Sequence, residues 1–228
     1  MIGLRQKKFL KNFREKIMST DNQHATPQET FWAGEFGSEY ISRNDSNQLL
    51  ASNLDFFSKA LRQAGKVSSC LEFGANIGMN MRALQLLFPG VESKAIEINP
   101  NAAKLLSNLI GEKNVYLGSI FNYPIAEVVD LALIKGVLIH INPDMLNTVY
   151  DKLYKSSKRL ILICEYYNPT PVAIPYRGHS DRLFKRDFAG EMLDKYSALR
   201  LIDYGFSYHR DPAFPQDDIN WFLMEKRT

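Results

Sequence analysis

A short apolar run at residues 69–73 leads directly into a turn that contains Gly74, Asn76 and Gly78, and then into a stretch of helical periodicity. Glycine allows sharp bends and a close approach of the backbone to a ligand, and Asn is the non-glycine residue that best tolerates a positive φ. A helix that begins directly after such a turn points its free N–H groups at whatever is bound there. The pattern therefore predicts a buried strand, a tight turn and a helix that hold a nucleotide.

A second apolar run, at residues 91–99, carries Glu97. It lies about two dozen residues after Gly74, where a doubly wound sheet places the carboxylate that binds the ribose hydroxyls. An NAD-binding fold would carry the same acid. The turn, however, lacks the G-x-G-x-x-G order that lets the backbone approach a pyrophosphate, and Glu72 would repel one. A carboxylate at this position instead suits a cationic ligand.

The string Glu72-Phe-Gly-Ala-Asn-Ile-Gly78 resembles the E/D-x-G-x-G-x-G signature of class I S-adenosylmethionine-dependent methyltransferases, with Asn76 where the middle glycine usually stands. The resemblance implies S-adenosyl-L-methionine as the cofactor. It also implies a Rossmann-like α/β fold that is doubly wound, with a seven-stranded, mostly parallel sheet and an antiparallel last strand.

By the same resemblance Glu97 takes the ribose, residues 118–120 lie along the adenine, and residues 135–136 close the pocket under the methionine part. Arg43 would bind the methionine carboxylate, and Trp32 would either cap the cofactor or pack a lid on the domain. The cofactor-binding residues expected on this basis are Trp32, Tyr40, Arg43, Glu72, Gly74, Ala75, Asn76, Gly78, Asn80, Glu97, Ile98, Asn99, Gly118, Ser119, Ile120, Lys135 and Gly136.

The chain is similar, more narrowly, to methylases associated with pseudaminic acid biosynthesis. The similarity runs from residue 27 to residue 227 and is carried by strings at residues 31–44, 133–144, 165–169 and 176–190. It implies that the acceptor is a sugar, a sugar-like acid or a nucleotide-activated sugar of surface-glycan biosynthesis.

With 228 residues, 45% of them hydrophobic, the chain can bury one sizeable α/β core. We expect a methyltransferase domain at residues 27–228, in which residues 27–66 form a lid and a helix, after a segment and linker at residues 1–26. Cys70 and Cys164 fall in predicted strands, so buried thiols in a reducing cytosol fit better than a disulfide framework. Without a signal peptide or a membrane-spanning run, a cytoplasmic protein is expected.

The formal net charge of +3 is unevenly distributed. Residues 1–17 hold six basic side chains and one acidic side chain, so the remaining residues bear a small net negative charge. Phe9, Phe13 and Ile17 are spaced four apart, which predicts a basic amphipathic helix. Three interpretations of this segment are open. It docks on the domain, it is an extension upstream of an alternative start at Met18, or it binds membranes or acidic partners. Because the domain is not basic, no nucleic-acid partner is expected, and no stable membrane insertion either.

Apolar runs without alternation, typical of strands that are covered on both faces, predict seven strands. They are expected at residues 69–73, 93–98, 114–117, 130–134, 159–164, 199–207 and 220–226. The last two should form an antiparallel pair. Helical periodicity predicts a helix at residues 47–64, and the aromatic residues and glycines of residues 27–44 predict a lid.

Methyl transfer from a sulfonium needs positioning, desolvation and, for a hydroxyl or amine acceptor, removal of a proton, but no metal. In an open α/β sheet the reacting groups lie beyond the carboxyl ends of the strands. His140 follows the predicted fourth strand and is a candidate general base; the alternative is a packing or hydrogen-bonding role in its loop. Glu165, at the end of the fifth strand, is a second catalytic candidate that would orient the acceptor.

Acceptor-binding residues are expected at the end of the fifth strand and in a polar stretch at residues 176–187. The basic side chains of this stretch would clamp a carboxylate or a phosphate, unless they lie in a solvated loop that Asp181 and Asp187 partly neutralise. The predicted set is Tyr166, Tyr167, Asn168, Tyr176, Arg177, His179, Arg182, Lys185 and Arg186.

These observations favour a methyltransferase that acts on a small polar acceptor, with O-methylation favoured over N-methylation. The alternatives are a S-adenosylmethionine-binding partner protein without catalysis, and a methyltransferase of RNA or protein. An NAD oxidoreductase ranks last.

Overall fold

The computed structural model describes residues 26–41 and 46–227. The predicted amphipathic segment, its linker up to residue 25 and the predicted cofactor residue Arg43 lie outside the described residues. The described elements, in chain order, are α2 (Pro27–Ala33), α3 (Glu35–Ile41), α4 (Asn47–Ala60), β1 (Ser69–Phe73), α5 (Met79–Leu87), β2 (Glu92–Glu97), α6 (Pro100–Ile110), η2 (Glu112–Asn114), β3 (Val115–Leu117), η3 (Ile120–Asn122), β4 (Val129–Lys135), η4 (Leu138–His140), η5 (Pro143–Met145), α7 (Leu146–Ser156), β5 (Ser157–Glu165), β6 (Val172–Tyr176), β7 (His179–Lys185), α8 (Phe188–Lys195), β8 (Leu199–Ser207) and β9 (Ile219–Lys226), where η marks a 3₁₀ turn.

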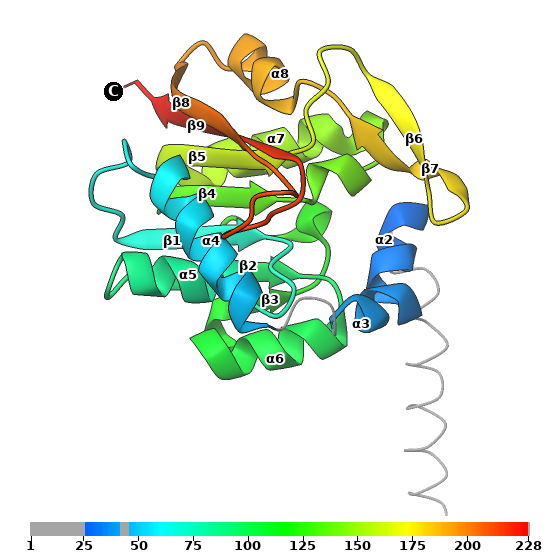
Figure 1. The fold of residues 1–228 in the computed structure, drawn as a ribbon, viewed down its shortest axis with the longest axis horizontal. Coiled ribbons are helices and arrows are strands. Elements are labelled where there is room, and N and C mark those ends of the chain that lie inside the picture. The colour runs from blue at the N-terminus through cyan, green and yellow to red at the C-terminus, as the bar shows by residue number, and fades with distance from the viewer. Residues whose placement is uncertain (1–25, 42–45, 228) are drawn as a thin grey trace, which may run out of the picture.

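Seven strands form one sheet in the order β3-β2-β1-β4-β5-β9-β8 (Figure 1). The strands from β3 to β5 are parallel, whereas β9 is antiparallel to both of its neighbours. This arrangement confirms the predicted doubly wound, mostly parallel α/β sheet with an antiparallel last strand. The strand order reverses between β1 and β4, and ligands of open α/β sheets bind beyond the carboxyl ends of the strands at such a point.

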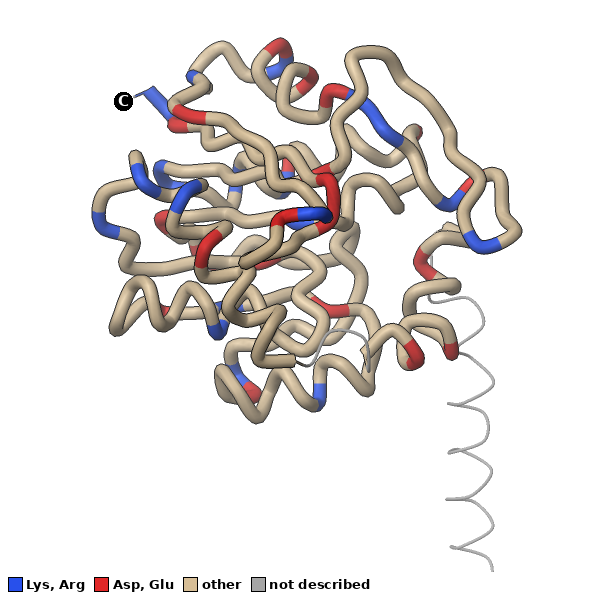
Figure 2. Tube along the Cα trace, viewed as in Figure 1, with Lys and Arg blue, Asp and Glu red and all other residues tan. Residues whose placement is uncertain are grey.

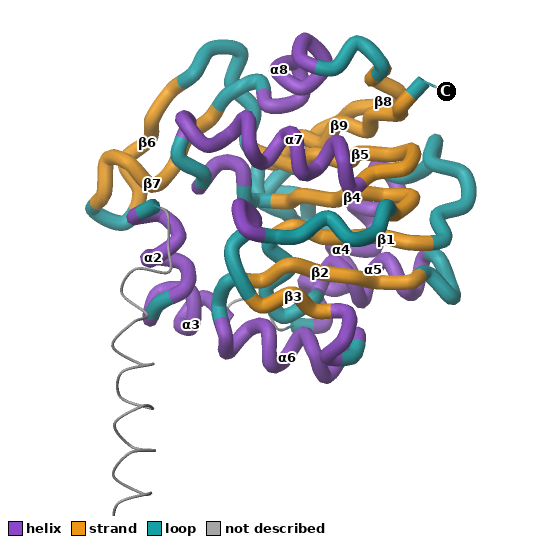
Figure 3. The backbone as a smooth tube through the Cα atoms, turned by 180° about the vertical axis from the view of Figure 1, so that it is seen from behind, coloured by secondary structure: helices purple, strands orange, loops and turns teal. Residues whose placement is uncertain are grey.

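Helices cover both faces of the sheet, which is why its strands read as apolar runs without alternation. Phe56 of α4, Leu84 of α5 and Leu106 of α6 share one buried cluster with side chains of β1, β4 and β5. Val149 of α7 and Met192 of α8 belong to the cluster on the opposite face, where Figure 3 shows α7 lying across the strands. Within the described residues, no helix has the length and apolar character needed to cross a membrane.

The polar stretch at residues 176–187, for which no strand was predicted, lies mostly within a hairpin formed by β6 and β7. Arg177 (φ 52°) and Gly178 (φ 81°) lie between the paired residues Tyr176 and His179, and a two-residue hairpin turn of this kind needs a positive φ at both positions. The hairpin stands outside the main sheet and β6 is largely exposed, so its sequence carries no buried face that alternation would have revealed.

The helices α2 and α3 and the β6–β7 hairpin lie together at one end of the molecule (Figure 1), and we call them the cap. Gln28 Nε2 donates a hydrogen bond of 2.9 Å to the Asp181 carbonyl oxygen, and the rings of Phe31 and His179 are 5.6 Å apart. Figure 2 shows Lys and Arg along the hairpin, whereas α2 and α3 carry only acidic charges. The residues expected to form a lid are thus two short helices, which contact the hairpin through a hydrogen bond and an aromatic pair.

The first prediction concerns the turn after β1. A Cβ added at Gly74 (φ 76°) would lie 2.7 Å from Val137 Cγ2, whereas a Cβ at Gly90 (φ 85°) would meet nothing within 4 Å. Both Gly74→Ala and Gly90→Ala strain the backbone, but only the first also overpacks a neighbour. We expect Gly74→Ala to lower the free energy of unfolding by about 1–3 kcal/mol more than Gly90→Ala does, as measured by denaturant titration. Equal losses would mean that Val137 moves away freely.

Candidate functional site

A cavity of about 780 Å³ opens at the carboxyl ends of β1, β2 and β4, between the cap and the loop that joins β8 to β9. This volume is within the range of small-molecule sites. The predicted site residues that line it are Trp32, Tyr40, Gly74, Ala75, Asn76, Asn80, Glu97, Ile98, Gly118, Ile120, Lys135, Gly136, His140, Tyr166, Tyr176 and Arg177.

The turn after β1 is held against β2 by backbone hydrogen bonds. The N–H groups of Gly74 and Ala75 both donate to the Ile96 carbonyl oxygen, at 2.9 and 3.1 Å. Asn76 has a φ of 50°, and Gly78 has a φ of 87° where α5 begins. The left-handed conformation at these positions accounts for the glycine and asparagine residues in the sequence.

Glu97 ends β2 and is only 7% exposed. Its Oε2 accepts the N–H of Asn76 and its Oε1 accepts the N–H of Asn99, both at 2.7 Å. Burial raises the pKa of Glu97, and the backbone hydrogen bonds from Asn99, Asn76 and Ile98 oppose that rise. A carboxylate offers about four acceptor positions in all, so with three backbone N–H groups on it Glu97 keeps the capacity to accept a further hydrogen bond from a hydroxyl group.

Glu72 lies fully buried in β1 and is not part of the cavity wall. Its Oε1 accepts a 2.6 Å hydrogen bond from Asn80 Nδ2, while its Oε2 has no partner among the described residues. Burial raises the pKa of Glu72 to about 8, against the effects of the Asn80 hydrogen bond and the Lys135 charge. The carboxyl group therefore holds its proton at neutral pH, and a positive charge brought close to it would favour release of that proton.

A chain of hydrogen bonds crosses the cavity wall. Lys135 Nζ donates to Gln216 Oε1 at 3.3 Å, and Gln216 Nε2 donates to Asn53 Oδ1 at 2.8 Å. This chain joins β4, the β8–β9 loop and α4, and burial lowers the pKa of Lys135. Sequence reasoning missed Asn53 and Gln216, because Asn53 lies inside an ordinary helical pattern and its partner is 163 residues away.

His140 ends η4 and is 8% exposed. Its Nδ1 lies 2.6 Å from the Arg182 carbonyl oxygen, which can only accept, so Nδ1 carries the hydrogen and Nε2 keeps its lone pair. The ring centroid is 4.7 Å from that of Trp32 and 5.4 Å from that of Tyr176. Because burial lowers the pKa of His140 to about 4, the imidazole is neutral at neutral pH. His140 thus has a structural bond through one nitrogen and a proton-accepting lone pair on the other.

Glu165 does not line the cavity, so it is not placed to orient an acceptor directly. It is 2% exposed, and its Oε1 accepts the N–H groups of Val137 and Leu138 at 2.9 and 2.8 Å. Burial raises the pKa of Glu165 to about 7, and the backbone hydrogen bonds from this loop oppose the rise. The carboxylate therefore lies behind the loop that follows β4 and holds its backbone.

The predicted acceptor-binding residues divide into two groups. Tyr166, Tyr176 and Arg177 line the cavity, whereas Tyr167, Asn168, His179, Arg182, Lys185 and Arg186 do not. The predicted clamp of several cations is therefore not assembled around the cavity. The side chains outside it have other partners, as the ion pairs of Arg182 with Asp181 and of Arg186 with Glu191 show, at 2.5 and 2.6 Å.

Among the predicted cofactor residues, Glu72, Gly78, Asn99 and Ser119 support the cavity from behind its wall. Asn99 Nδ2, for example, donates to the Trp32 carbonyl oxygen at 3.2 Å, and Ser119 Oγ hydrogen-bonds Glu29. The lining residues absent from the sequence prediction come mainly from the cap, α4, the loops after β3 and β4, and the β8–β9 loop. They are Thr26, Gln28, Glu29, Leu49, Asn53, Ile77, Met79, Ile96, Phe121, Val137, Ile141, His209, Pro215, Gln216, Asp217 and Ile219.

No family model and no curated protein sequence matches the chain. Solved structures are similar to it over most of its length. The 1,6-didemethyltoxoflavin N1-methyltransferase of Burkholderia thailandensis, with 1,6-didemethyltoxoflavin and S-adenosylhomocysteine bound, has a TM-score of 0.67 and 17% identity, covering 90% of this chain and 92% of that chain. The magnesium protoporphyrin IX methyltransferase of Synechocystis PCC 6803, with S-adenosylmethionine bound, has a TM-score of 0.63 and 10% identity, covering 90% and 99%.

The N-methyltransferase NodS of Bradyrhizobium japonicum WM9 is a third similar structure, with a TM-score of 0.59 and 16% identity over 81% of this chain and 99% of that chain. At these identities the similarity establishes the fold, which is that of Rossmann-like S-adenosylmethionine-dependent methyltransferases. These structures do not include a methylase of pseudaminic acid biosynthesis.

The second prediction follows from the raised pKa of Glu72. Between the ordinary pKa of 4.5 and the folded-state value of about 8, the folded protein binds more protons than the unfolded chain, so this group makes stability fall as pH rises. Glu72→Gln keeps an oxygen for Asn80 and removes the titration. We expect the stability of the variant relative to wild type to increase from pH 5 to pH 8 in denaturant titrations. The exposed Glu92→Gln serves as the control, and a difference that stays constant with pH for Glu72→Gln would refute the assignment.

Proposed function

We propose that the chain is an S-adenosylmethionine-dependent methyltransferase that methylates a small polar acceptor. The observation that carries the proposal is Glu97, a buried carboxylate at the end of β2 that lines the cavity and is fixed by two backbone N–H groups. The fold and the turn after β1 support it, because Glu97 then stands where this fold binds ribose hydroxyls.

The residues of the cavity fit this cofactor. Glu97 retains the capacity to accept a hydrogen bond from a hydroxyl group, and Asn76 Oδ1 is a buried acceptor atom without a partner among the described residues. Glu97 favours a cationic ligand over an anionic one, and so does Glu72 once a nearby positive charge favours release of its proton. When bound, S-adenosylmethionine would supply an electrophilic methyl group on a positively charged sulfur.

The contribution of the chain is then positioning, exclusion of water and acceptance of a proton. The cap residue Trp32 contacts His140 and shields this side of the cavity. The neutral His140 ring, oriented through Nδ1, offers Nε2 to the hydroxyl or amine of an acceptor. Its low pKa makes it a weak base, so it would orient the acceptor and take the proton only as the new bond to carbon forms.

Within this proposal the acceptor is a sugar-like molecule with an anionic group, and O-methylation is favoured over N-methylation. The sequence resemblance to pseudaminic acid methylases motivates the sugar. Arg177 motivates the anion, because its guanidinium carbon lies 5.9 and 5.8 Å from the ring centroids of Phe36 and Tyr176, and no acidic side chain pairs with it in the described part of the chain. Aromatic faces such as Tyr176 and Trp32 also suit the apolar face of a sugar ring.

The third prediction tests the cofactor. Glu97→Ala should weaken the binding of S-adenosylmethionine and S-adenosylhomocysteine by about 1–3 kcal/mol, because buried hydroxyl groups lose a charged acceptor. Isothermal titration calorimetry measures this directly. Glu92→Ala, an exposed acid at the opposite end of the same strand, should leave both affinities unchanged. Unchanged binding to Glu97→Ala would remove Glu97 from the site, and tight binding of NAD would overturn the cofactor assignment.

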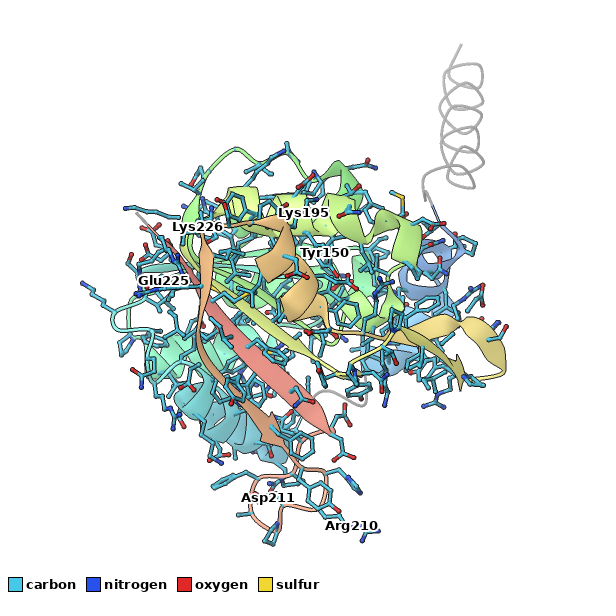
Figure 4. All side chains as sticks on the ribbon, turned by 90° about the horizontal axis from the view of Figure 1, so that it is seen from above. Tyr150, Lys195, Arg210, Asp211, Glu225 and Lys226 are labelled. Atoms are coloured by element: carbon cyan, nitrogen blue, oxygen red, sulfur yellow. The ribbon has the colours of Figure 1, made fainter. Side chains whose placement is uncertain are left out.

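The fourth prediction tests the acceptor. A screen of nucleotide-activated sugars with methyl-labelled cofactor should yield products with anionic acceptors. For such an acceptor, Arg177→Ala should raise KM about tenfold or more, as expected from the loss of a hydrogen bond to a charged group, with the affinity for S-adenosylhomocysteine unchanged. Arg210→Ala, at the tip of the β8–β9 loop (Figure 4), is the matched control. An acceptor KM that does not change in Arg177→Ala would exclude Arg177 from acceptor recognition.

A further inference from the structure

Glu165 is a buried carboxyl group to which the proposed methyl transfer assigns no role. It belongs to β5, yet both hydrogen bonds of its Oε1 go to the backbone of the loop after β4, at Val137 and Leu138. These two residues are 28 and 27 positions away in the sequence. The other oxygen, Oε2, is buried without a partner among the described residues. A carboxylate removed from water is costly unless it is well paired, so this arrangement makes the loop and the carboxylate depend on each other.

The backbone that Glu165 holds connects the two halves of the cavity. Val137 packs against the turn after β1, because a Cβ on Gly74 would lie 2.7 Å from Val137 Cγ2. Leu138 begins η4, which ends at His140, and the His140 N–H donates to the Val137 carbonyl oxygen at 2.9 Å. Any shift of this short segment would therefore move Val137 relative to the turn and His140 relative to the acceptor side.

Among the described residues, the side-chain hydrogen bond and the aromatic contacts of the His140 ring all go to the cap. Its side-chain hydrogen bond goes to Arg182 of the hairpin, and its nearest aromatic partner, Trp32, belongs to α2. Both partners are parts of the cap, not of the sheet. The sheet fixes the position of His140 through the backbone of η4, and Glu165 supplies the side-chain hydrogen bonds to that backbone.

We infer that Glu165 is a positioning residue that anchors the loop from Val137 to His140 to β5 and so fixes His140 against the cavity. The inference deepens the proposed function, since it assigns the group that keeps the proton acceptor of that reaction in place. Glu165 acts through the loop and touches neither substrate nor cofactor.

The protonation of Glu165 gives the inference a signature in pH. The titratable groups that face it are Lys135 of β4, Tyr150 of α7, and Cys164 and Tyr166 at the end of β5. With a pKa of about 7, Glu165 is ionised and holds the two N–H groups most strongly above that pH. Below it, the neutral carboxyl group is a weaker acceptor, so the loop should open more often. The His140 ring stays neutral throughout, because its own pKa is about 4.

The experiment measures acylation of His140 by diethyl pyrocarbonate between pH 5.5 and pH 8 in the full chain, with peptide mapping to separate it from the other histidines. In wild type the rate constant, corrected for the reagent, should rise several-fold as pH falls through 7. Glu165→Ala should acylate about tenfold faster at pH 8 than wild type. Glu165→Gln keeps one oxygen acceptor, so it should fall between the two and show no step near pH 7.

Glu191→Gln is the matched control, since Glu191 of α8 is a partly buried carboxylate that accepts from Arg186 and from Tyr150, at 2.6 and 2.7 Å. It should behave as wild type. Where Glu165→Ala fails to fold, Glu165→Gln decides. Wild-type rates and a retained pH step in Glu165→Gln would overturn the inference. Titration of each variant with S-adenosylhomocysteine separates the positioning role of Glu165 from the methyltransferase assignment. A protein that binds no cofactor but shows the predicted His140 reactivity would refute only the methyltransferase assignment.

Discussion

A carboxylate that is removed from water must be given hydrogen-bond donors, and this requirement organises the whole carboxyl edge of the sheet. Glu72, Glu97 and Glu165 are each 7% exposed or less, and each stands at or near the end of a strand. Asn80 donates to one oxygen of the first, two backbone N–H groups donate to the second, and the loop after β4 donates to one oxygen of the third. The turn after β1 and the loops after β2 and β4 therefore direct backbone N–H groups at buried carboxyl groups, which constrains their conformation.

The same charges decide which ligand the cavity can hold. Two acids, Glu72 and Glu97, lie at the end that the turn after β1 forms, and Lys135 is the cation that partly offsets them. Burial pushes both carboxyl pKa values up and the Lys135 pKa down, so the isolated site carries less charge than its composition suggests. A cationic ligand would reverse part of that shift by restoring the ionised carboxylates, which couples binding to proton release. An anionic pyrophosphate would gain nothing from this coupling.

Much of the fold was predictable because the information is local. The strand at residues 199–207 was predicted to the residue, and the predicted strand that carries Glu97 ended one residue beyond the end of β2. The hairpin at residues 172–185 was missed, since it lies outside the sheet and its strands bury no continuous face. Strands of the main sheet are therefore readable from sequence to within about a residue, whereas a hairpin that lies outside the sheet, in the cap, is not.

Side-chain direction at the site was less predictable, and for a physical reason. The sequence places Glu165 at the correct edge of the sheet, but whether its carboxylate faces the cavity depends on donors that are 27 and 28 residues away. The hairpin poses the same problem. Arg182 and Arg186 form ion pairs with Asp181 and Glu191. Among the described residues, Arg177 is the basic side chain of the hairpin that lines the cavity. A dense run of charges therefore signals recognition only after its ion pairs are removed. Among the described residues this leaves two cations of the run, Arg177 and Lys185, and Arg177, which lies near two aromatic rings and lines the cavity, is the candidate for binding an anionic group.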